Sequence, residues 1–176
     1  MLRANHKYVR NGNYGDRIMK KRILIIDDDA SIRSSLEKIL TENGYDLAVA
    51  ANGEDAQAEF AQADLLILDL NLPIQDGWDI LGDVSSGYPL LPVIVITGLA
   101  DQLDERTIPG ASAFLEKPIE VPTLLQTMEH LLNLTPEERA AESRGNSDLW
   151  HPSASRFGSQ RRAKSTAQTL KRFKAL

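Results

Sequence analysis

The residues best suited to chemistry stand near the start of the chain, where three consecutive carboxylates follow an apolar run. Residues 23–26 are all isoleucine or leucine, which predicts a short buried strand, and Asp27, Asp28 and Asp29 come directly after it. Carboxylates packed at the end of a buried strand repel one another, and their burial is costly unless they are paired or bind a metal. The stretch therefore predicts a cation at this end of the strand.

Three further polar residues follow apolar runs elsewhere in the chain. Asp69 and Thr97 each lie at the end of such a run, and Lys117 comes just after a third one. These runs span residues 65–70, 92–98 and 113–116. Continuous apolar strands indicate a parallel sheet covered on both faces, and ligands bind such sheets at the carboxyl ends of the strands. We therefore expect these three side chains to meet the acidic cluster at one edge of a sheet.

The types of residue at this edge indicate a phosphoryl-transfer site. Carboxylate oxygens without histidine or cysteine favour Mg²⁺, or Mn²⁺, over zinc or copper. Lys117 adds a positive charge and Thr97 a hydroxyl donor, which together can neutralise the oxygens of a phosphoryl group. Asp69 is then the natural nucleophile and would form an aspartyl phosphate.

Five strand patterns alternate with five helical patterns. The expected strands are residues 23–26, 45–51, 65–70, 92–98 and 113–116. The expected helices are residues 31–44, 52–62, 78–86, 100–107 and 122–134, the fourth at best short because Pro109-Gly110 follows it. Ser31 and Asn52 are the expected N-caps of the first two helices, and Gly44 the expected stop of the first. This alternation predicts an α/β fold, a doubly wound five-stranded parallel sheet with helices on both faces.

Composition excludes several other classes of protein. The 176 residues are 42% hydrophobic, but they contain no apolar run long enough for a membrane span. There is no cysteine, which excludes disulfides and cysteine-based zinc or redox chemistry. The first residues are polar and basic and lack the apolar core of a secretory signal, and Met19 would itself make a plausible start. We expect a cytoplasmic protein without membrane partners.

The uneven distribution of charge divides the chain into three parts. The net charge is −5, but residues 23–132 hold four basic and twenty acidic residues, whereas both ends are basic. We expect a flexible basic arm over residues 1–20, one domain over residues 21–134, and a basic, largely disordered tail over residues 135–176. Within the tail, residues 161–176 carry six basic side chains and no acidic one, and could form a helix.

Four motifs, in unbroken order, resemble those of the receiver domain of two-component response regulators. They are LIIDDD for the acidic pair, LDLNLPIQDG for the acceptor strand and loop, VIVITG for the hydroxyl, and FLEKP for the lysine. The resemblance covers about residues 21–132 and implies a flavodoxin-like fold with strand order 2-1-3-4-5. It also implies a signalling protein that is not an enzyme but catalyses its own aspartyl phosphorylation and dephosphorylation.

The resemblance implies a metal-dependent acceptor. Asp69 would take a phosphoryl group from the phosphohistidine of a histidine kinase or a histidine phosphotransfer protein. Asp28, Asp69 and the backbone carbonyl of Asn71 would bind Mg²⁺ directly, with Mn²⁺ as an alternative. Asp27 would act on the metal through a coordinated water.

The resemblance also implies a switch. Thr97 and Lys117 would hold oxygens of the phosphoryl group, and Phe114 would turn inward as Thr97 moves toward the phosphate. The residues alone predict an ordinary core position for Phe114 equally well. The peptide bond between Lys117 and Pro118 would be cis. Asp29 fits a plain cap or turn residue.

The sequence departs from the family's pattern between Thr97 and Lys117 as well as in the tail after the domain. Thr97 and Lys117 are 20 positions apart, a residue or two fewer than is usual in the family. The shortening falls on the fourth helix, next to the surface that the family commonly uses for output or dimerisation. Asp76-Gly77, after the acceptor loop, is most simply a turn.

Three functions remain open on the sequence alone. The first is a receiver that switches its binding to an unknown downstream protein, with a phosphorylation-dependent dimer as an option. The second is a transcription regulator whose residues 161–176 bind DNA. The third is a phosphohydrolase of the haloacid-dehalogenase type, which the order of motifs disfavours. That family has its nucleophile first, as Asp-x-Asp, whereas this chain has an acidic pair first and a lone acceptor in the middle.

Overall fold

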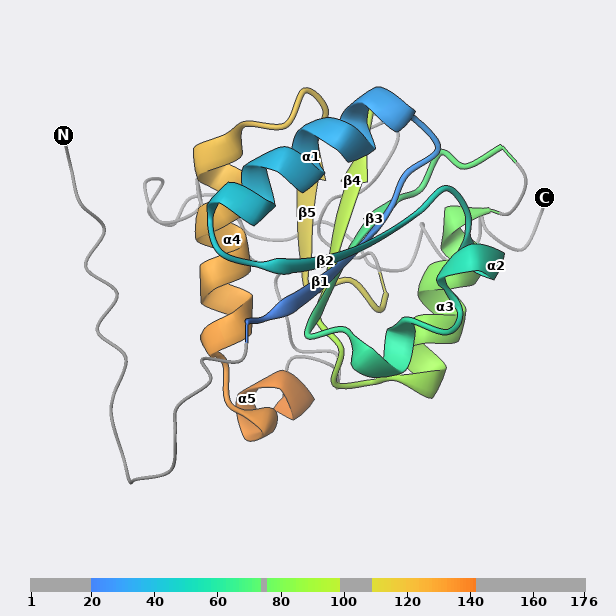
Figure 1. Cartoon of the computed structure of the whole chain (residues 1–176). Coiled ribbons are helices and arrows are strands. Elements are labelled where there is room, and N and C mark those ends of the chain that lie inside the picture. Colours follow the sequence, from blue (N-terminus) through green and yellow to red (C-terminus); the bar gives the residue numbers. More distant parts are fainter. Residues whose placement is uncertain (1–19, 74–75, 99–108, 142–176) are drawn as a thin grey trace, which may run out of the picture.

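A single parallel sheet lies between two layers of helix in the computed structural model, which describes residues 20–73, 76–98 and 109–141 (Figure 1). The predicted helix at 100–107 and the predicted segment 161–176 lie outside the described residues, as does the N-terminal arm up to residue 19. Among the described residues, no helix combines the length and the apolar character that crossing a membrane requires.

The sheet confirms the predicted fold and strand order. Its strands are β1 (Arg22–Ile26), β2 (Asp46–Ala50), β3 (Leu65–Asp69), β4 (Val93–Thr97) and β5 (Ala113–Glu116). All pairings are parallel, in the order β2-β1-β3-β4-β5. Ile26 pairs with Leu68, and Asp69 with Ile96, so the inner strands end at the same edge.

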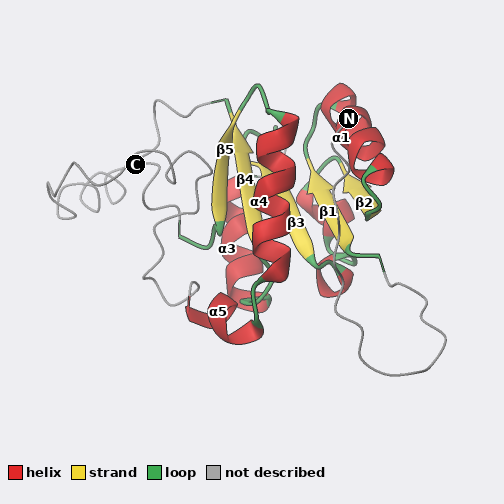
Figure 2. Ribbon diagram, turned by 90° about the vertical axis from the view of Figure 1, so that its left-hand side faces the viewer, coloured by secondary structure: helices red, strands yellow, loops and turns green. Residues whose placement is uncertain are grey.

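The helices cover both faces of this sheet. They are α1 (Ala30–Glu42), α2 (Gly53–Ala56), the short 3₁₀ helix η1 (Phe60–Gln62), α3 (Gly77–Gly87), α4 (Val121–Asn133) and α5 (Pro136–Ala141). Figure 2 shows α1 and α4 on the near face of the sheet, with α3 behind it. One core cluster joins α1 and α4 to the sheet, and a second joins α2 and α3 to the other face.

The inner strands are apolar throughout because both of their faces are covered. Every residue of β3 and β4 is buried, as are residues 23–26 of β1. Each fully buried leucine or isoleucine stabilises the fold by roughly 2 kcal/mol relative to an exposed one. This burial holds the strand ends rigidly and so fixes the polar residues that follow them.

The N-terminus of α1 corrects one predicted cap. The carboxylate of Asp29, not the hydroxyl of Ser31, caps the helix, because it accepts hydrogen bonds from the amides of Ser31 and Ile32. Asn52 caps α2 as predicted. Gly44 follows the end of α1 with φ of 91°, a conformation that favours glycine, so the predicted stop is confirmed.

Two helices differ from their predicted bounds. The helix predicted over residues 52–62 is broken: α2 ends at Ala56, the chain turns through residues 57–59, and η1 follows. The turn places Glu59 against Arg22, with 2.7 Å between carboxylate and guanidinium, and it buries Phe60. Asp76-Gly77 is not a separate turn, since Asp76 is the N-cap of α3 and Gly77 its first residue.

Helix α5 comes just after the predicted domain boundary at residue 134. Thr135 and Glu138 form a capping box at its start. The Thr135 amide donates to the Glu138 carboxylate at 2.8 Å, and the Glu138 amide donates to the Thr135 hydroxyl at 3.2 Å. Arg139 donates from its guanidinium to the Leu132 carbonyl at 3.2 Å, which ties α5 back to α4.

Candidate functional site

Asp27 and Asp69 lie side by side at the ends of β1 and β3, and both are 3% exposed. Each carboxylate is held by the backbone amide two residues further along the chain. The Asp29 amide donates to Asp27 Oδ1 at 2.8 Å, and the Asn71 amide donates to Asp69 Oδ1 at 2.9 Å. The two matching turns leave the other oxygen of each carboxylate free to face a cation.

Lys117 reaches both of these oxygens from the end of β5. Its Nζ lies 2.9 Å from Asp27 Oδ2 and 2.5 Å from Asp69 Oδ2, and its side chain is 21% exposed. The Lys117 amide donates to the Thr97 carbonyl at 3.0 Å, which extends the pairing of β4 and β5 by one bond. The peptide bond between Lys117 and Pro118 is cis, as the resemblance to receiver domains implies. Lys117 thus links the end of β5 to the ends of β1, β3 and β4.

Asp28 completes a cluster of three carboxylates. It is exposed, and it offers an oxygen within 4.8 Å of oxygens of Asp27 and Asp69. When all three are ionised, Lys117 balances only one of the three negative charges. An all-oxygen set with two uncompensated charges fits a hard divalent cation such as Mg²⁺.

Burial and the hydrogen bonds to charged partners have opposite effects on the pKa values of Asp27 and Lys117. Burial raises the pKa of Asp27, although the hydrogen bonds from Lys117 and from the Asp29 amide pull it down. Burial alone would lower the pKa of Lys117, but its hydrogen bonds to Asp69 and Asp27 outweigh this effect and raise the pKa. The ammonium is therefore firmly charged, while the buried carboxylate beside it is incompletely compensated.

The remaining predicted residues lie on β4 and β5 or just after β3. Thr97 is fully buried at the end of β4, one position beyond Ile96, the partner of Asp69. Asn71 is exposed at the start of the loop that follows β3. Phe114 pairs with Val95 across β5 and β4 and is 1% exposed, within the core on the face of α2 and α3.

Two residues near the site had no role at the site predicted from the sequence. Arg33, in the first turn of α1, donates from Nη1 to the Asp27 carbonyl at 2.6 Å and so ties the acidic loop to the helix. Gly77 packs against the chain next to the acceptor: a Cβ atom there would lie 2.5 Å from Leu70 Cα and 2.7 Å from the Asp69 carbonyl oxygen. Arg33 had one usable signal, since it is one of four basic residues between residues 23 and 132.

Comparisons with known proteins point to one family. The family model of the response regulator receiver domain matches residues 23–129. The response regulator MprA of Mycobacterium bovis (strain BCG / Pasteur 1173P2) is 38% identical over 130 residues, which cover 71% of this chain and 56% of MprA. The chain thus spans about half the length of the curated relatives it matches.

Solved structures agree as well. A CheY-like receiver domain protein from Methanospirillum hungatei JF-1 has a TM-score of 0.59 and 29% identity, covering 70% of this chain and 99% of that one. The response regulator TrrA of Thermotoga maritima, solved in complex with Mg²⁺-BeF, has a TM-score of 0.58 and 29% identity. It covers 63% of this chain and 98% of its own.

These matches correct one expectation from the sequence. The family model describes a receiver domain, and the matched relatives are named response regulators, which is a signalling role rather than a catalytic one. The expectation that the domain catalyses its own aspartyl phosphorylation and dephosphorylation is therefore withdrawn. The phosphohydrolase alternative is set aside on the same finding.

The fold, the acidic cluster and the comparisons lead to one assignment. The sheet order and the layering of helices match those of solved receiver domains, and the family model covers more than half of the residues. The chain belongs to the family of response regulator receiver domains of two-component systems.

Proposed function

We propose that Asp69 is the phosphoryl acceptor of this receiver and that its phosphorylation changes the affinity of residues 21–134 for a downstream protein. The observation that carries the proposal is the convergence of Asp69, Lys117 and two further carboxylates at one strand edge, with Lys117 Nζ 2.5 Å from Asp69 Oδ2. The donor is a histidine kinase or a histidine phosphotransfer protein, and the proposed location is the cytoplasm.

The chemistry balances as a direct transfer. A carboxylate oxygen of Asp69 attacks the phosphorus of a phosphohistidine, the P–N bond breaks, and the imidazole leaves and takes up a proton. The product is an acyl phosphate on Asp69. Lys117 then exchanges its contact with Asp69 for a phosphoryl oxygen, and Thr97 donates its hydroxyl to another.

The donor set supports a divalent cation beside Asp69. Asp28, Asp69 and the backbone carbonyl of Asn71 would hold Mg²⁺ directly, and Asp27 would act through a water, with Mn²⁺ as an alternative. A bound cation neutralises negative charge that develops on the phosphoryl oxygens. The structurally similar response regulator TrrA was solved in complex with Mg²⁺-BeF, which supports the choice of metal.

Thr97 and Phe114 form the proposed switch. A hydroxyl drawn toward the phosphoryl group vacates space at the end of β4, and a buried aromatic ring on the adjacent strand can respond by changing rotamer. A phosphorylation-dependent dimer is one form that the response could take.

Transfer from a radiolabelled phosphohistidine donor tests the acceptor. A panel of phosphorylated phosphotransfer proteins is offered with Mg²⁺ to the full chain, to Asp69→Asn and to Asp83→Asn, an exposed aspartate on α3. We expect base-labile radiolabel on the unaltered chain and on Asp83→Asn. We expect no radiolabel on Asp69→Asn. Equal labelling of Asp69→Asn would refute the assignment.

Binding of beryllofluoride with Mg²⁺, followed by NMR shifts, tests the site without a covalent step. We expect shifts around Thr97 and Lys117 that require both Mg²⁺ and Asp69. An unchanged spectrum in the folded protein would mean that the site does not hold a phosphoryl group.

A further inference from the structure

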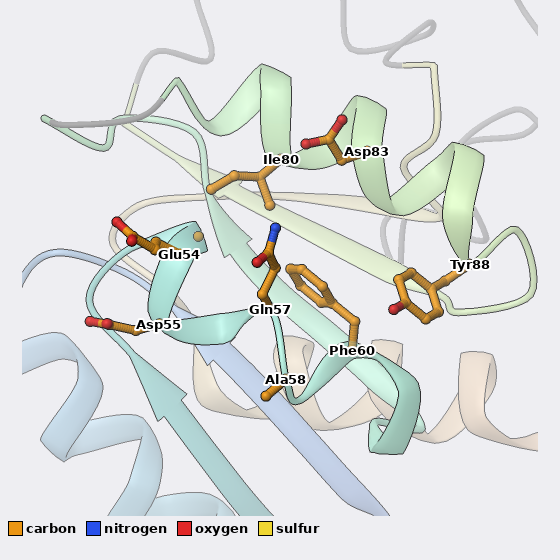
Figure 3. A pocket seen from close by; sticks show the side chains of 9 residues that line it. Glu54, Asp55, Gln57, Ala58, Phe60, Ile80, Asp83 and Tyr88 are labelled. Carbon is orange, nitrogen blue, oxygen red and sulfur yellow. The ribbon is translucent and has the colours of Figure 1, made fainter.

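A cavity of about 800 Å³ lies between α2 and α3, and none of the three clustered carboxylates lines it (Figure 3). Its floor contains the buried side chains of Phe60 and Ile80. The ring of Tyr88 lies against Phe60, with 5.7 Å between ring centroids and 48° between ring planes. The cavity is within the size range of binding sites in proteins and offers an apolar, partly aromatic floor.

The early end of α2 accounts for the hollow. After Ala56 the chain turns through residues 57–59, so no further helical turn of α2 lies along α3. Figure 3 shows the side chain of Gln57 reaching toward Ile80, between the two walls. The cavity therefore lies where the helix predicted over residues 52–62 is broken. The proposed acceptor function does not use this cavity.

The rim of the cavity is acidic. Glu54 and Asp55 on α2 and Asp83 on α3 are exposed, and they come from facing walls (Figure 3). Among the described residues that line the cavity, none is lysine or arginine. A ligand that combines positive charge with apolar side chains would fit both the rim and the floor.

Residues 161–176 of the same chain have this composition. They include six basic and no acidic side chains. They also include Leu170, Phe173 and Leu176, three apolar residues at intervals of three, interleaved with Lys171, Arg172 and Lys174. The basic side chains complement the three carboxylates of the rim, and the apolar ones suit the floor of Phe60 and Ile80.

The connection between α5 and residues 161–176 is long enough to reach the cavity. Residues 142–160 separate α5 from this segment, and such a connection spans up to roughly 60 Å when extended. A domain of this size has a radius of gyration of only about 13 Å. A covalently attached segment meets the cavity at an effective concentration in the millimolar range, so a weak contact suffices for occupancy.

We propose that residues 161–176 dock in the cavity between α2 and α3 of their own domain, with apolar side chains on the Phe60–Ile80 floor and basic side chains at the Glu54–Asp55–Asp83 rim. The docking covers Tyr88 and makes α3 the element that contacts both the segment and, through Gly77, the acceptor loop.

Paramagnetic relaxation in the full chain tests the docking. Because the chain has no cysteine, Ser86→Cys on α3 gives one site for a nitroxide label near the cavity. The matched control is Ser34→Cys, another exposed helical serine, on α1 and so on the opposite face of the sheet. We expect amide signals of residues 161–176 to lose intensity with the label at position 86 and to keep it with the label at position 34.

Charge reversal distinguishes binding at the acidic rim from a general attraction of the basic segment to an acidic domain. Glu54→Lys with Asp83→Lys should abolish the loss of intensity. The same change in charge on the other face, Glu37→Lys with Glu129→Lys, should leave it in place. Raising the salt concentration should weaken the effect, because exposed charges are screened.

Each of the following outcomes would overturn the proposal. Equal effects from both label positions, or none from either, would mean that the segment does not bind this cavity. Loss of intensity on residues 1–19 instead would assign the cavity to the other basic end. An effect seen only between labelled and isotope-enriched chains in a mixture would assign it to a second copy.

Discussion

Gly77 and Asp69 are packed so closely that no side chain fits between them. A Cβ atom on Gly77 would lie 2.7 Å from the Asp69 carbonyl oxygen and 2.5 Å from Leu70 Cα. Such distances require backbone to move, since real Cβ atoms do not approach backbone this closely. The first residue of α3 therefore fixes the position of the proposed acceptor.

Gly77→Ala is expected to destabilise the protein and displace the acceptor loop. Overpacking of this kind costs about 1–3 kcal/mol in the free energy of unfolding. Gly82→Ala is the matched control, because a Cβ at this position of the same helix meets no atom within 4 Å. It should stabilise α3 by about 0.5–1 kcal/mol. Urea denaturation measures the free energy of unfolding of both variants. Similar changes in this free energy for Gly77→Ala and Gly82→Ala would contradict the steric argument.

The sequence was sufficient for residues whose role depends on type and on position at a strand end. Asp27, Asp69 and Lys117 each follow an apolar run, and a parallel sheet brings such positions to one edge. Gly77 and Arg33 could not be found in the same way, since their contacts depend on how a loop or helix returns to a strand end. A glycine after an aspartate predicts a turn equally well.

The break in the helix predicted over residues 52–62 could not be predicted, for a similar reason. Residues 53–62 suit a continuous helix, but contacts distant in sequence decide the outcome. Glu59 pairs with Arg22, and Phe60 is buried against Tyr88. Neither partner can be inferred from local periodicity, so the cavity that results from the break could not be predicted either.

Lys117→Met should destabilise the metal-free protein. Removing the ammonium leaves the buried carboxylates of Asp27 and Asp69 without their cation, and breaking a buried pair costs on the order of 3 kcal/mol. Mg²⁺ should recover part of this loss, because a divalent cation can compensate the same charges. Lys38→Met, at an exposed position of α1, is the control. The comparison is urea denaturation in EDTA and in Mg²⁺, and a variant as stable as wild type in EDTA would count against the ion pair.

Asp28→Asn should have the opposite effect in the absence of metal. It removes one of three neighbouring negative charges, so the free energy of unfolding in EDTA should rise by up to about 1 kcal/mol. The stabilisation that Mg²⁺ gives to the wild-type chain should be lost, because a proposed ligand is missing. A melting temperature that still rises with Mg²⁺ would exclude Asp28 from the metal site.

The capping box of α5 should respond to acid. Hydrogen bonds that the Glu138 carboxylate accepts from the Thr135 amide and the Thr135 hydroxyl lower its pKa below its ordinary value of 4.5. For an acid whose pKa is lowered by folding, the stabilisation is present above the ordinary pKa and is lost as the pH falls through the lowered one. Above pH 4.5 the box should be intact, and below the lowered pKa the start of α5 should fray.

The amide proton shift of Thr135, followed by NMR as the pH is lowered, reports this transition. We expect its midpoint below pH 4.5, and a midpoint at or above that value would contradict the capping geometry. Glu138→Gln is the control, since it keeps an acceptor oxygen but does not titrate, so the transition should disappear. Thr135→Ala removes the hydroxyl that donates to the carboxylate but keeps the backbone amide, so it should return the pKa of Glu138 part of the way toward 4.5.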